Sequence, residues 1–181
     1  MSRLTRRLPG PLFASLALLF ATAAGADSVS DVRARAKAAI LPADAVDASR
    51  ALRRAGLQTE AITTIQRAFG KARGDDALGD LHLELARSYI DQRQQKKALR
   101  ECDQLHKLSP YKEQICQAEA QLLTRRGSAA LPAAEQALAI NAGDYDALVA
   151  KGRALTQLGK PSDAETVLSD ARKRAPNRPE A

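Results

Sequence analysis

The residues of this sequence that most readily take part in chemistry are two cysteines and two histidines. His106 follows Cys102 by four residues, so both side chains would share one side of a helix, and Cys116 is close in sequence. A Cys-His-Cys metal site is one interpretation. It lacks an obvious fourth ligand, its intervals differ from those of zinc modules, and His82 is distant in the sequence. We therefore expect no metal site.

Catalytic and cofactor patterns are also missing from the sequence. A hydrolytic enzyme needs a nucleophile with a base, or paired carboxylates in a pocket. Acidic pairs such as Asp75-Asp76 fit solvated loop or helix-cap positions instead. There is no C-x-x-C-H haem motif and no glycine-rich phosphate loop. The sequence thus predicts neither an enzyme nor a bound cofactor.

The two cysteines are better explained as a disulfide pair. Cys102 precedes Pro110 by eight residues, and Cys116 follows it by six. If two antiparallel helices meet at this proline, the two sulfurs lie at similar heights. An oxidising compartment would then favour a Cys102–Cys116 bridge. Two reduced, buried cysteines are the alternative.

The N-terminal segment has the features of an export signal in the expected order. Three arginines stand among the first seven residues, and residues 12–20 are almost entirely apolar but too short to span a bilayer. Small residues then supply an A-x-A site. We expect residues 1–26 to be a signal peptide cleaved before Asp27, leaving a mature periplasmic chain with no membrane span. The alternative is a buried apolar helix at the start of the fold.

The charge of the chain does not favour a nucleic-acid partner. The chain has 28 Lys and Arg against 21 Asp and Glu, a net charge of +7. Removal of the three arginines in the predicted signal would reduce this to +4. There is no Trp, and Phe and Tyr number three each, so aromatic residues that could stack on bases are scarce.

Helix-forming residues dominate the chain after Pro42, and the β-branched alternation typical of strands is missing. Gly and Pro recur at spaced points, as breaks between helices do. We predict nine helices. One lies within residues 27–41, as an N-terminal helix or linker, and eight form four hairpins over residues 42–178. Residues 179–181 would be a tail.

The last hairpin, residues 145–178, has the clearest pattern. Its characteristic positions are Leu148, Gly152, Leu155, Gly159, Ala164, Leu168, Ala171 and Pro176. Gly152 and Ala164 are small where two helices must approach closely, and Leu168 fills the space beside them. Gly159 allows a left-handed turn between the helices. This segment resembles the tetratricopeptide repeat.

The same pattern recurs upstream near the period of about 34 residues that this repeat has. Residues 79–112 fit well, with Cys102 at a large apolar position. Residues 113–144 place Gly127 at the turn and fit only if the turn is about two residues short. Residues 42–75 are a degenerate first copy. The resemblance implies an all-α solenoid of about four hairpins in a right-handed superhelix with a concave face, with the N-terminal helix covering the first hairpin or dangling.

The resemblance also indicates where a ligand would bind. In the tetratricopeptide family, ligand-contacting residues project from the first helix of each hairpin. Carried over to this sequence, they form one row of Arg50, Arg87, Gln121 and Arg153, and a neighbouring row of Arg54, Asp91, Arg125 and Gln157, with Gln117 between them. This implies a polar, cationic groove with few acids, suited to an acidic segment or a C-terminus. Ordinary solvated helix faces in an arginine-rich chain are the alternative.

A protein-binding function follows from the resemblance. We expect a periplasmic scaffold or adaptor that binds partner segments in its concave groove, for an envelope machine of pilus, secretion, motility or cell-wall assembly. The alternative is a chaperone-like holder of unfolded or outer-membrane-bound polypeptides. Such a holder would use apolar groove residues such as Leu83, Ile90 and Val149.

Overall fold

The computed structural model describes residues 27–178, which form an all-α structure. The helices in these residues are α1 (Val29–Ala38), α2 (Pro42–Arg54), α3 (Gln58–Ala68), the short 3-10 helix η1 (Phe69–Lys71), α4 (Asp75–Asp91), α5 (Gln95–Leu108), α6 (Pro110–Leu123), α7 (Gly127–Ile140), α8 (Tyr145–Gln157) and α9 (Pro161–Arg174). The prediction of an all-α fold with nine helices is confirmed over this part of the chain.

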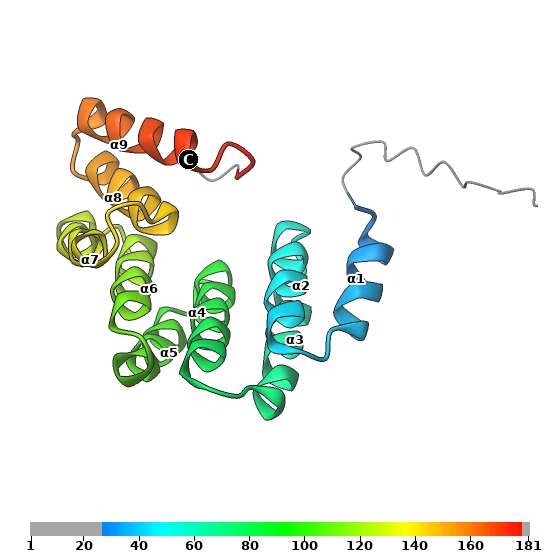
Figure 1. Ribbon diagram of the computed structural model, residues 1–181. Coiled ribbons are helices and arrows are strands. Elements are labelled where there is room, and N and C mark those ends of the chain that lie inside the picture. The colour runs from blue at the N-terminus through cyan, green and yellow to red at the C-terminus, as the bar shows by residue number, and fades with distance from the viewer. Residues whose placement is uncertain (1–26, 179–181) are drawn as a thin grey trace, which may run out of the picture.

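Eight of the helices pair into four hairpins, α2–α3, α4–α5, α6–α7 and α8–α9. Each first helix also contacts the first helix of the next hairpin, so α2, α4, α6 and α8 form an inner layer. The second helices form an outer layer, and each packs against the following first helix. Figure 1 shows the array curving through an arc from α1 to α9. This is the predicted α-solenoid.

Each hairpin turn contains one residue in the left-handed backbone region. Gly56 and Gly159 take this conformation in the first and last turns, with φ of 76° and 72°. Arg93 and Arg125 take it in the second and third turns, with φ of 58° and 57°. All four hairpins therefore turn in the same way, although only two of them use glycine at this position.

Counted from these left-handed residues, the four hairpins share one register. The residue seven places earlier is always small and buried: Ser49, Ala86, Ala118 and Gly152. The residue five places later is always a buried alanine: Ala61, Ala98, Ala130 and Ala164. Because small side chains recur at both positions, the two helices of every hairpin can approach closely.

The expected turn at Gly127 is wrong. Gly127 is the first residue of α7, and the turn is made by Arg125 two residues earlier. A methyl group on Gly127 would lie 2.8 Å from the carbonyl oxygen of Ala154 in α8. This glycine therefore allows α7 to approach α8 closely, and it plays no part in reversing the chain.

Capping residues fix where two of the inner helices begin. The Ser109 side chain accepts a hydrogen bond from the Lys112 amide at the start of α6, whose first residue is Pro110. The Asp144 side chain accepts one from the Ala147 amide, at 2.7 Å, at the start of α8. These bonds satisfy amide groups that a helix N-terminus leaves without partners.

The hairpins differ by a few residues from the predicted units. The second runs over 75–108 where 79–112 was expected, because α4 begins a turn earlier at two aspartates favoured by a helix N-terminus. The third runs over 110–140 where 113–144 was expected, because α6 follows α5 directly. The first and last hairpins begin at residues 42 and 145, where the predicted units begin.

The N-terminal helix α1 covers the first hairpin. Val32 and Ala36 are buried against Leu52 and its neighbours in α2 and α3. Arg33 also pairs with Glu60 of α3 at 2.7 Å. At the other end of the array, most of the polar face of α9 is exposed. At one end of the array, α1 thus covers the apolar surface of the first hairpin. At the other end, the last helix presents a polar face to solvent.

The predicted signal peptide, residues 1–26, and the tail, residues 179–181, lie outside the described residues. The right-handed sense of the superhelix stays a prediction. Between residues 27 and 178, no helix combines the length and the apolar character that crossing a membrane requires.

Candidate functional site

A groove of about 950 Å³ lies along the inner layer, with walls from α2, α4, α6, α8 and the residues after α9. Six arginines line it, namely Arg50, Arg53, Arg54, Arg87, Arg153 and Arg178. Five carboxylates line it as well, namely Asp47, Glu84, Asp91, Glu119 and Asp146. The expectation of a cationic groove with few acids is therefore wrong, because the two signs are nearly balanced.

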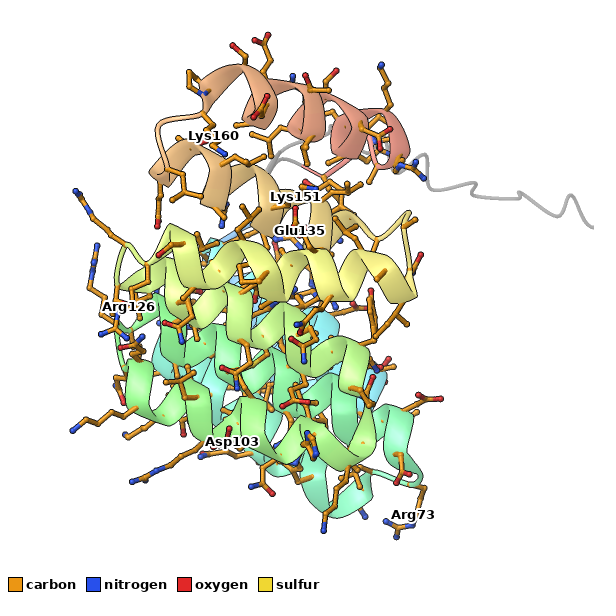
Figure 2. The ribbon with its side chains drawn as sticks, turned by 90° about the vertical axis from the view of Figure 1, so that its left-hand side faces the viewer. Arg73, Asp103, Arg126, Glu135, Lys151 and Lys160 are labelled. Atoms are coloured by element: carbon orange, nitrogen blue, oxygen red, sulfur yellow. A yellow bond between two sulfur atoms is a disulfide. The ribbon has the colours of Figure 1, made fainter. Side chains whose placement is uncertain are left out.

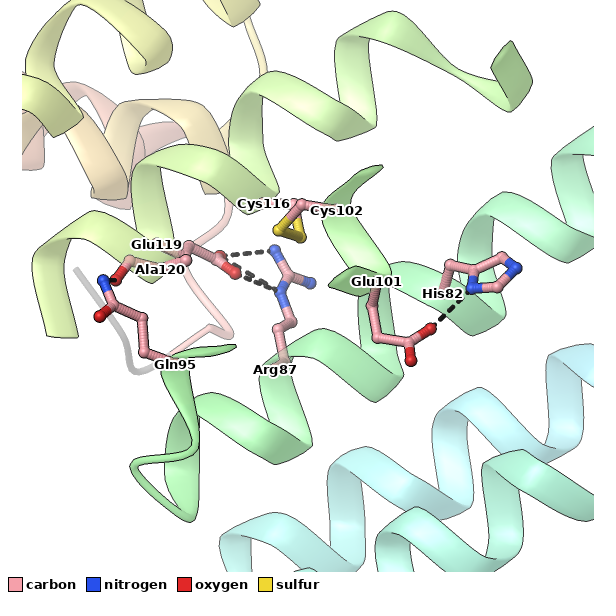
Figure 3. The surroundings of a disulfide bond; sticks show 8 residues. All are labelled: His82, Arg87, Gln95, Glu101, Cys102, Cys116, Glu119 and Ala120. Carbon is pink, nitrogen blue, oxygen red and sulfur yellow. Dashed lines mark hydrogen bonds and ion pairs between the residues drawn. A yellow bond between two sulfur atoms is a disulfide. The ribbon is translucent and has the colours of Figure 1, made fainter. Parts of the chain in front are cut away.

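Arg87, expected to meet a ligand, is buried in an ion-pair network, and its side chain is only 9% exposed. From α4 it donates to both oxygens of Glu119 on α6, at 2.8 and 2.9 Å (Figure 3). Its Nη2 also lies 2.9 Å from Oδ2 of Asp146 on α8. Burial opposes the charge of Arg87, but Glu119 and Asp146 outweigh it and raise the guanidinium pKa. Arg87 therefore links the three inner helices α4, α6 and α8 through ion pairs.

A second group of ion pairs joins α2 to α4. Glu84 is 1% exposed and accepts a hydrogen bond from Nη1 of Arg53 at 2.9 Å, while Nε of Arg50 lies 3.5 Å from its other oxygen. Arg53 also donates to Asp91 at 2.6 Å. Burial opposes the charge of Arg53, but Glu84 and Asp91 raise its pKa overall. Arg50 and Asp91 thus line the groove as predicted, but both are already engaged.

The residues after α9 turn back onto the groove wall at α8. Arg178 donates to Asp146 at 2.6 Å, and its guanidinium carbon lies 4.0 Å from the centre of the Tyr145 ring. The Tyr145 hydroxyl donates to the Arg178 carbonyl at 3.3 Å. Burial raises the pKa of Asp146, but Arg87 and Arg178 more than reverse this and hold it below its ordinary value.

Two groove arginines have no carboxylate partner in the described structure, although Nε of Arg54 donates to the Arg50 carbonyl at 3.3 Å. Arg54 on α2 and Arg153 on α8 are exposed, and neither forms an ion pair with any carboxylate of residues 27–178. Between them, Ile90, Leu122 and Val149 give the groove lining an apolar strip. The groove therefore combines an ion-paired floor, an apolar strip and two cations without acidic partners in the described structure.

The remaining predicted residues divide between the groove and other positions. Gln157 of α8 lines the groove. Gln117 and Gln121 are half-buried in α6 outside the groove lining. Arg125 is exposed in the turn after α6, also outside the lining. These three fall on the third hairpin, where the predicted register was shifted.

A two-residue shift explains why Glu119 was missed. Arg50, Arg87 and Arg153 each stand six residues before the left-handed residue of their turn. In the third hairpin that position is Glu119, whereas the predicted register placed Gln121 there. With Arg125 recognised as the turn residue, the row would have read Arg, Arg, Glu, Arg. The acid in that row was therefore present in the sequence but assigned to the wrong position.

The predicted disulfide between Cys102 and Cys116 is present (Figure 3). Cys102 lies on α5 and Cys116 on α6, with their Cα atoms 5.4 Å apart. Both residues are fully buried. The bridge joins the outer helix of the second hairpin to the inner helix of the third.

The two histidines have carboxylate partners. Nδ1 of His106 lies 3.0 Å from Glu113, and Nδ1 of His82 lies 2.8 Å from Glu101. Within residues 27–178, no group of three or more His, Cys, Asp or Glu residues could hold a metal ion. The cysteine sulfurs are bonded to each other, so the Cys-His-Cys interpretation does not fit this arrangement.

Comparison with known proteins agrees with the hairpin geometry. Residues 121–181 match the family described as tetratricopeptide repeat. No curated protein matches the chain. The matched segment includes α7, α8 and α9, and the register of small residues in its hairpins continues through α2–α3 and α4–α5. Residues 121–181 are therefore similar to the tetratricopeptide repeat family, and the hairpins before them repeat the same geometry.

Proposed function

We propose that this protein holds a segment of a partner protein in the groove along α2, α4, α6 and α8. Tetratricopeptide repeats are modules of protein–protein interaction. The observation that carries the proposal is the difference between the ion-paired residues of the groove and those without an ionic partner. Most of its charges are already paired, while Arg54, Arg153 and an apolar strip are left to meet a ligand.

The groove lining suggests the chemistry of the bound segment. Apolar side chains would pack against Ile90, Leu122 and Val149, which removes apolar surface from water. Carboxylates at the flanks would meet Arg54 or Arg153, since a guanidinium can take a carboxylate in two parallel hydrogen bonds. The segment is therefore apolar at its centre and acidic at one or both ends, and a C-terminal carboxylate could serve as one of the acids. Arg87 contributes to the shape of the groove floor, because its donors are already taken.

The proposal includes export to the periplasm. The basic start, the short apolar core at residues 12–20 and the A-x-A site before Asp27 support it. The disulfide agrees with export, because such bonds persist mainly in oxidising compartments. N-terminal sequencing of the protein from a periplasmic extract should give Asp27 as the first residue. Intact Met1 in cytosolic protein would contradict export.

The role we favour is that of an adaptor in an envelope machine of pilus, secretion, motility or cell-wall assembly. A groove with charges at set positions selects a particular motif, which suits an adaptor. The alternative, a holder of unfolded polypeptides, would need a broad apolar surface. Leu83, expected to contribute to such a surface, is buried in the core and absent from the groove lining. Ile90 and Val149 do line the groove, but Val149 is itself buried, at 6% exposure.

Peptide arrays can separate the two roles. Wild-type protein should bind a limited set of peptides in which apolar residues are flanked by Asp or Glu, and Arg153→Glu should lose that set. Arg172→Glu on the exposed surface of α9 is the matched control and should keep it. Broad binding of apolar peptides that is unaffected by Arg153→Glu would favour the holder. No selective binding at all would contradict a segment-binding groove.

A further inference from the structure

The turns inside the four hairpins lie side by side along one edge of the array, called here the turn edge. Arg53 at the end of α2 pairs with Asp91 at the end of α4. The Gln95 side chain at the start of α5 donates to Oγ1 of Thr124 in the third turn, at 3.1 Å. The Gln157 side chain at the end of α8 likewise bonds the end of α6. These bonds connect each turn to the next.

The turn edge carries a concentration of cations. Its second, third and fourth turns and the helix starts that follow them hold one exposed acid, Asp163, and six exposed cations: Arg93, Lys96, Lys97, Arg125, Arg126 and Lys160. None of these six forms an ion pair with a carboxylate of the described residues, and Lys97 lies 5.4 Å above the Tyr89 ring. The chain after residue 26 has a net charge of +4, so everything outside these six residues sums to −2.

The opposite edge, where one hairpin joins the next, is different because it carries charges of both signs, including Arg73, Asp75 and Asp76. Lys112 pairs with Asp80 at 2.7 Å, and His106 lies 3.0 Å from Glu113. Figure 2 shows Arg126 and Lys160 on one side of the molecule and Arg73 on the other. The excess positive charge of the protein is therefore located on the turn edge.

We propose that the turn edge binds the phosphate-bearing headgroups of an anionic lipid surface. Protein interfaces are depleted in lysine and centre on aromatic anchors, and no aromatic residue between residues 27 and 178 is exposed. Long, unpaired cations spread over successive turns suit a surface on which many anions are mobile. Leu158, 38% exposed beside Lys160 in the last turn, adds an apolar group that can enter the boundary between headgroups and acyl chains.

The proposal is independent of the groove. The six cations of the turn edge are absent from the groove lining. A protein could therefore bind lipid at the turn edge whether or not its groove holds a partner segment. Each Lys or Arg near an anionic bilayer strengthens binding by about fivefold, so a few of them suffice for a measurable effect.

Vesicle co-sedimentation of the full chain tests the proposal. Vesicles of equal parts phosphatidylglycerol and phosphatidylcholine are compared with phosphatidylcholine alone. Arg126→Gln with Lys160→Gln should lower the affinity for the anionic vesicles about 25-fold, from the two lost cations. The control is Arg172→Gln with Lys173→Gln, which removes the same charge from α9, and it should change the affinity less than twofold. Residues 1–26 are identical in all variants, so their contribution cancels in the comparison.

Three results would overturn the proposal. The first is equal binding to the anionic and neutral vesicles. The second is an equal loss for the two double variants, which would indicate a response to net charge alone. The third is competition by soluble glycerol phosphate at the same phosphate concentration, which would indicate a site for single anions. The supporting outcome is a loss of vesicle affinity confined to the turn-edge variant. In that case soluble glycerol phosphate should not compete with the vesicles for the wild-type protein, and added salt should weaken its binding to them.

Discussion

The guanidinium of Arg87 faces both carboxylate oxygens of Glu119 across the contact between α4 and α6, at 2.8 and 2.9 Å. The same guanidinium neutralises Asp146 on α8. The carboxylates are about one-fifth exposed, so water compensates them only partly. Arg87 thus contributes to the packing of one hairpin on the next, and substitutions there should act first on stability.

Replacing Arg87 by Gln should lower the free energy of unfolding by about 3 kcal/mol, because two mostly buried carboxylates lose their common partner. Urea denaturation followed by circular dichroism measures the change. Arg172→Gln, at an exposed position on α9, should stay within about 0.5 kcal/mol of wild type. Equal unfolding midpoints for the two variants would show that the Arg87 network contributes nothing to stability.

The lowered pKa of Asp146 predicts a specific pH dependence. An unfolded aspartate has a pKa of about 3.9, so the stability from this shift is fully present above about pH 4. It is lost as the pH falls through the lower folded pKa. Asp146→Asn should therefore be less stable than wild type at pH 7, and the difference should narrow towards about pH 2. Urea midpoints across this range measure it. A difference that stays the same at pH 7 and at about pH 2 would contradict this prediction.

Removal of the disulfide should destabilise the array. Cys102 and Cys116 are separated by 14 residues in the sequence, and a closed loop of this size contributes about 3 kcal/mol in chain-entropy terms. The double variant Cys102→Ala, Cys116→Ala should lower the unfolding free energy by about that amount. A non-reduced digest of the wild-type protein should contain the linked peptide in mass spectrometry. Two alkylatable thiols in protein from an oxidising compartment would contradict the bridge.

Gly152→Ala should destabilise the last hairpin although alanine favours helix formation. The added methyl group would lie 2.5 Å from Cγ and Cδ2 of Leu168, and such overpacking costs about 1 to 3 kcal/mol. Thermal unfolding should show a lower midpoint. In the Leu168→Ala background the same substitution should cost less, because the clash is gone. An equal cost in both backgrounds would show that the Gly152–Leu168 contact does not limit packing.

Arg153→Glu should weaken binding of an acidic-flanked peptide at least tenfold, because a charge-assisted hydrogen bond is lost and a repulsive charge replaces it. Fluorescence anisotropy with a peptide selected on the array measures the affinity. The melting temperature should not change, since Arg153 makes no ion pair with the described residues. This separates Arg153 from Arg87, whose substitution should lower both affinity and stability. If Arg172→Glu weakens binding equally, Arg153 is not a specific contact.

The fold could be predicted from the sequence because its signals are local. Gly152, Ala164 and Leu168 belong to one hairpin, so their spacing alone describes how two helices pack. The third hairpin was harder, because its left-handed residue is Arg125 and the glycine two residues later, Gly127, was taken as the turn.

The groove was harder to predict than the fold, because its character depends on contacts between hairpins. A register position gives the direction of a Cα–Cβ bond, and this correctly placed Arg50, Arg54 and Arg153 in the groove. The direction does not show where a long side chain ends. Arg87 reaches across to Glu119 and Asp146, which lie 32 and 59 residues further along the chain. Whether such an arginine is available to a ligand is decided by its neighbours on other helices.

The bridge between α5 and α6 also divides the array into parts that can open independently. Non-covalent contacts between adjacent hairpins hold each end, whereas a covalent link joins the two central hairpins. In a linear array, local opening starts where a unit has a neighbour on one side only. Amide hydrogens of α1 at one end and of α8–α9 at the other should therefore exchange with solvent before those of α5 and α6. Partial opening of either end would widen the groove for an entering segment while the clamped centre keeps its shape.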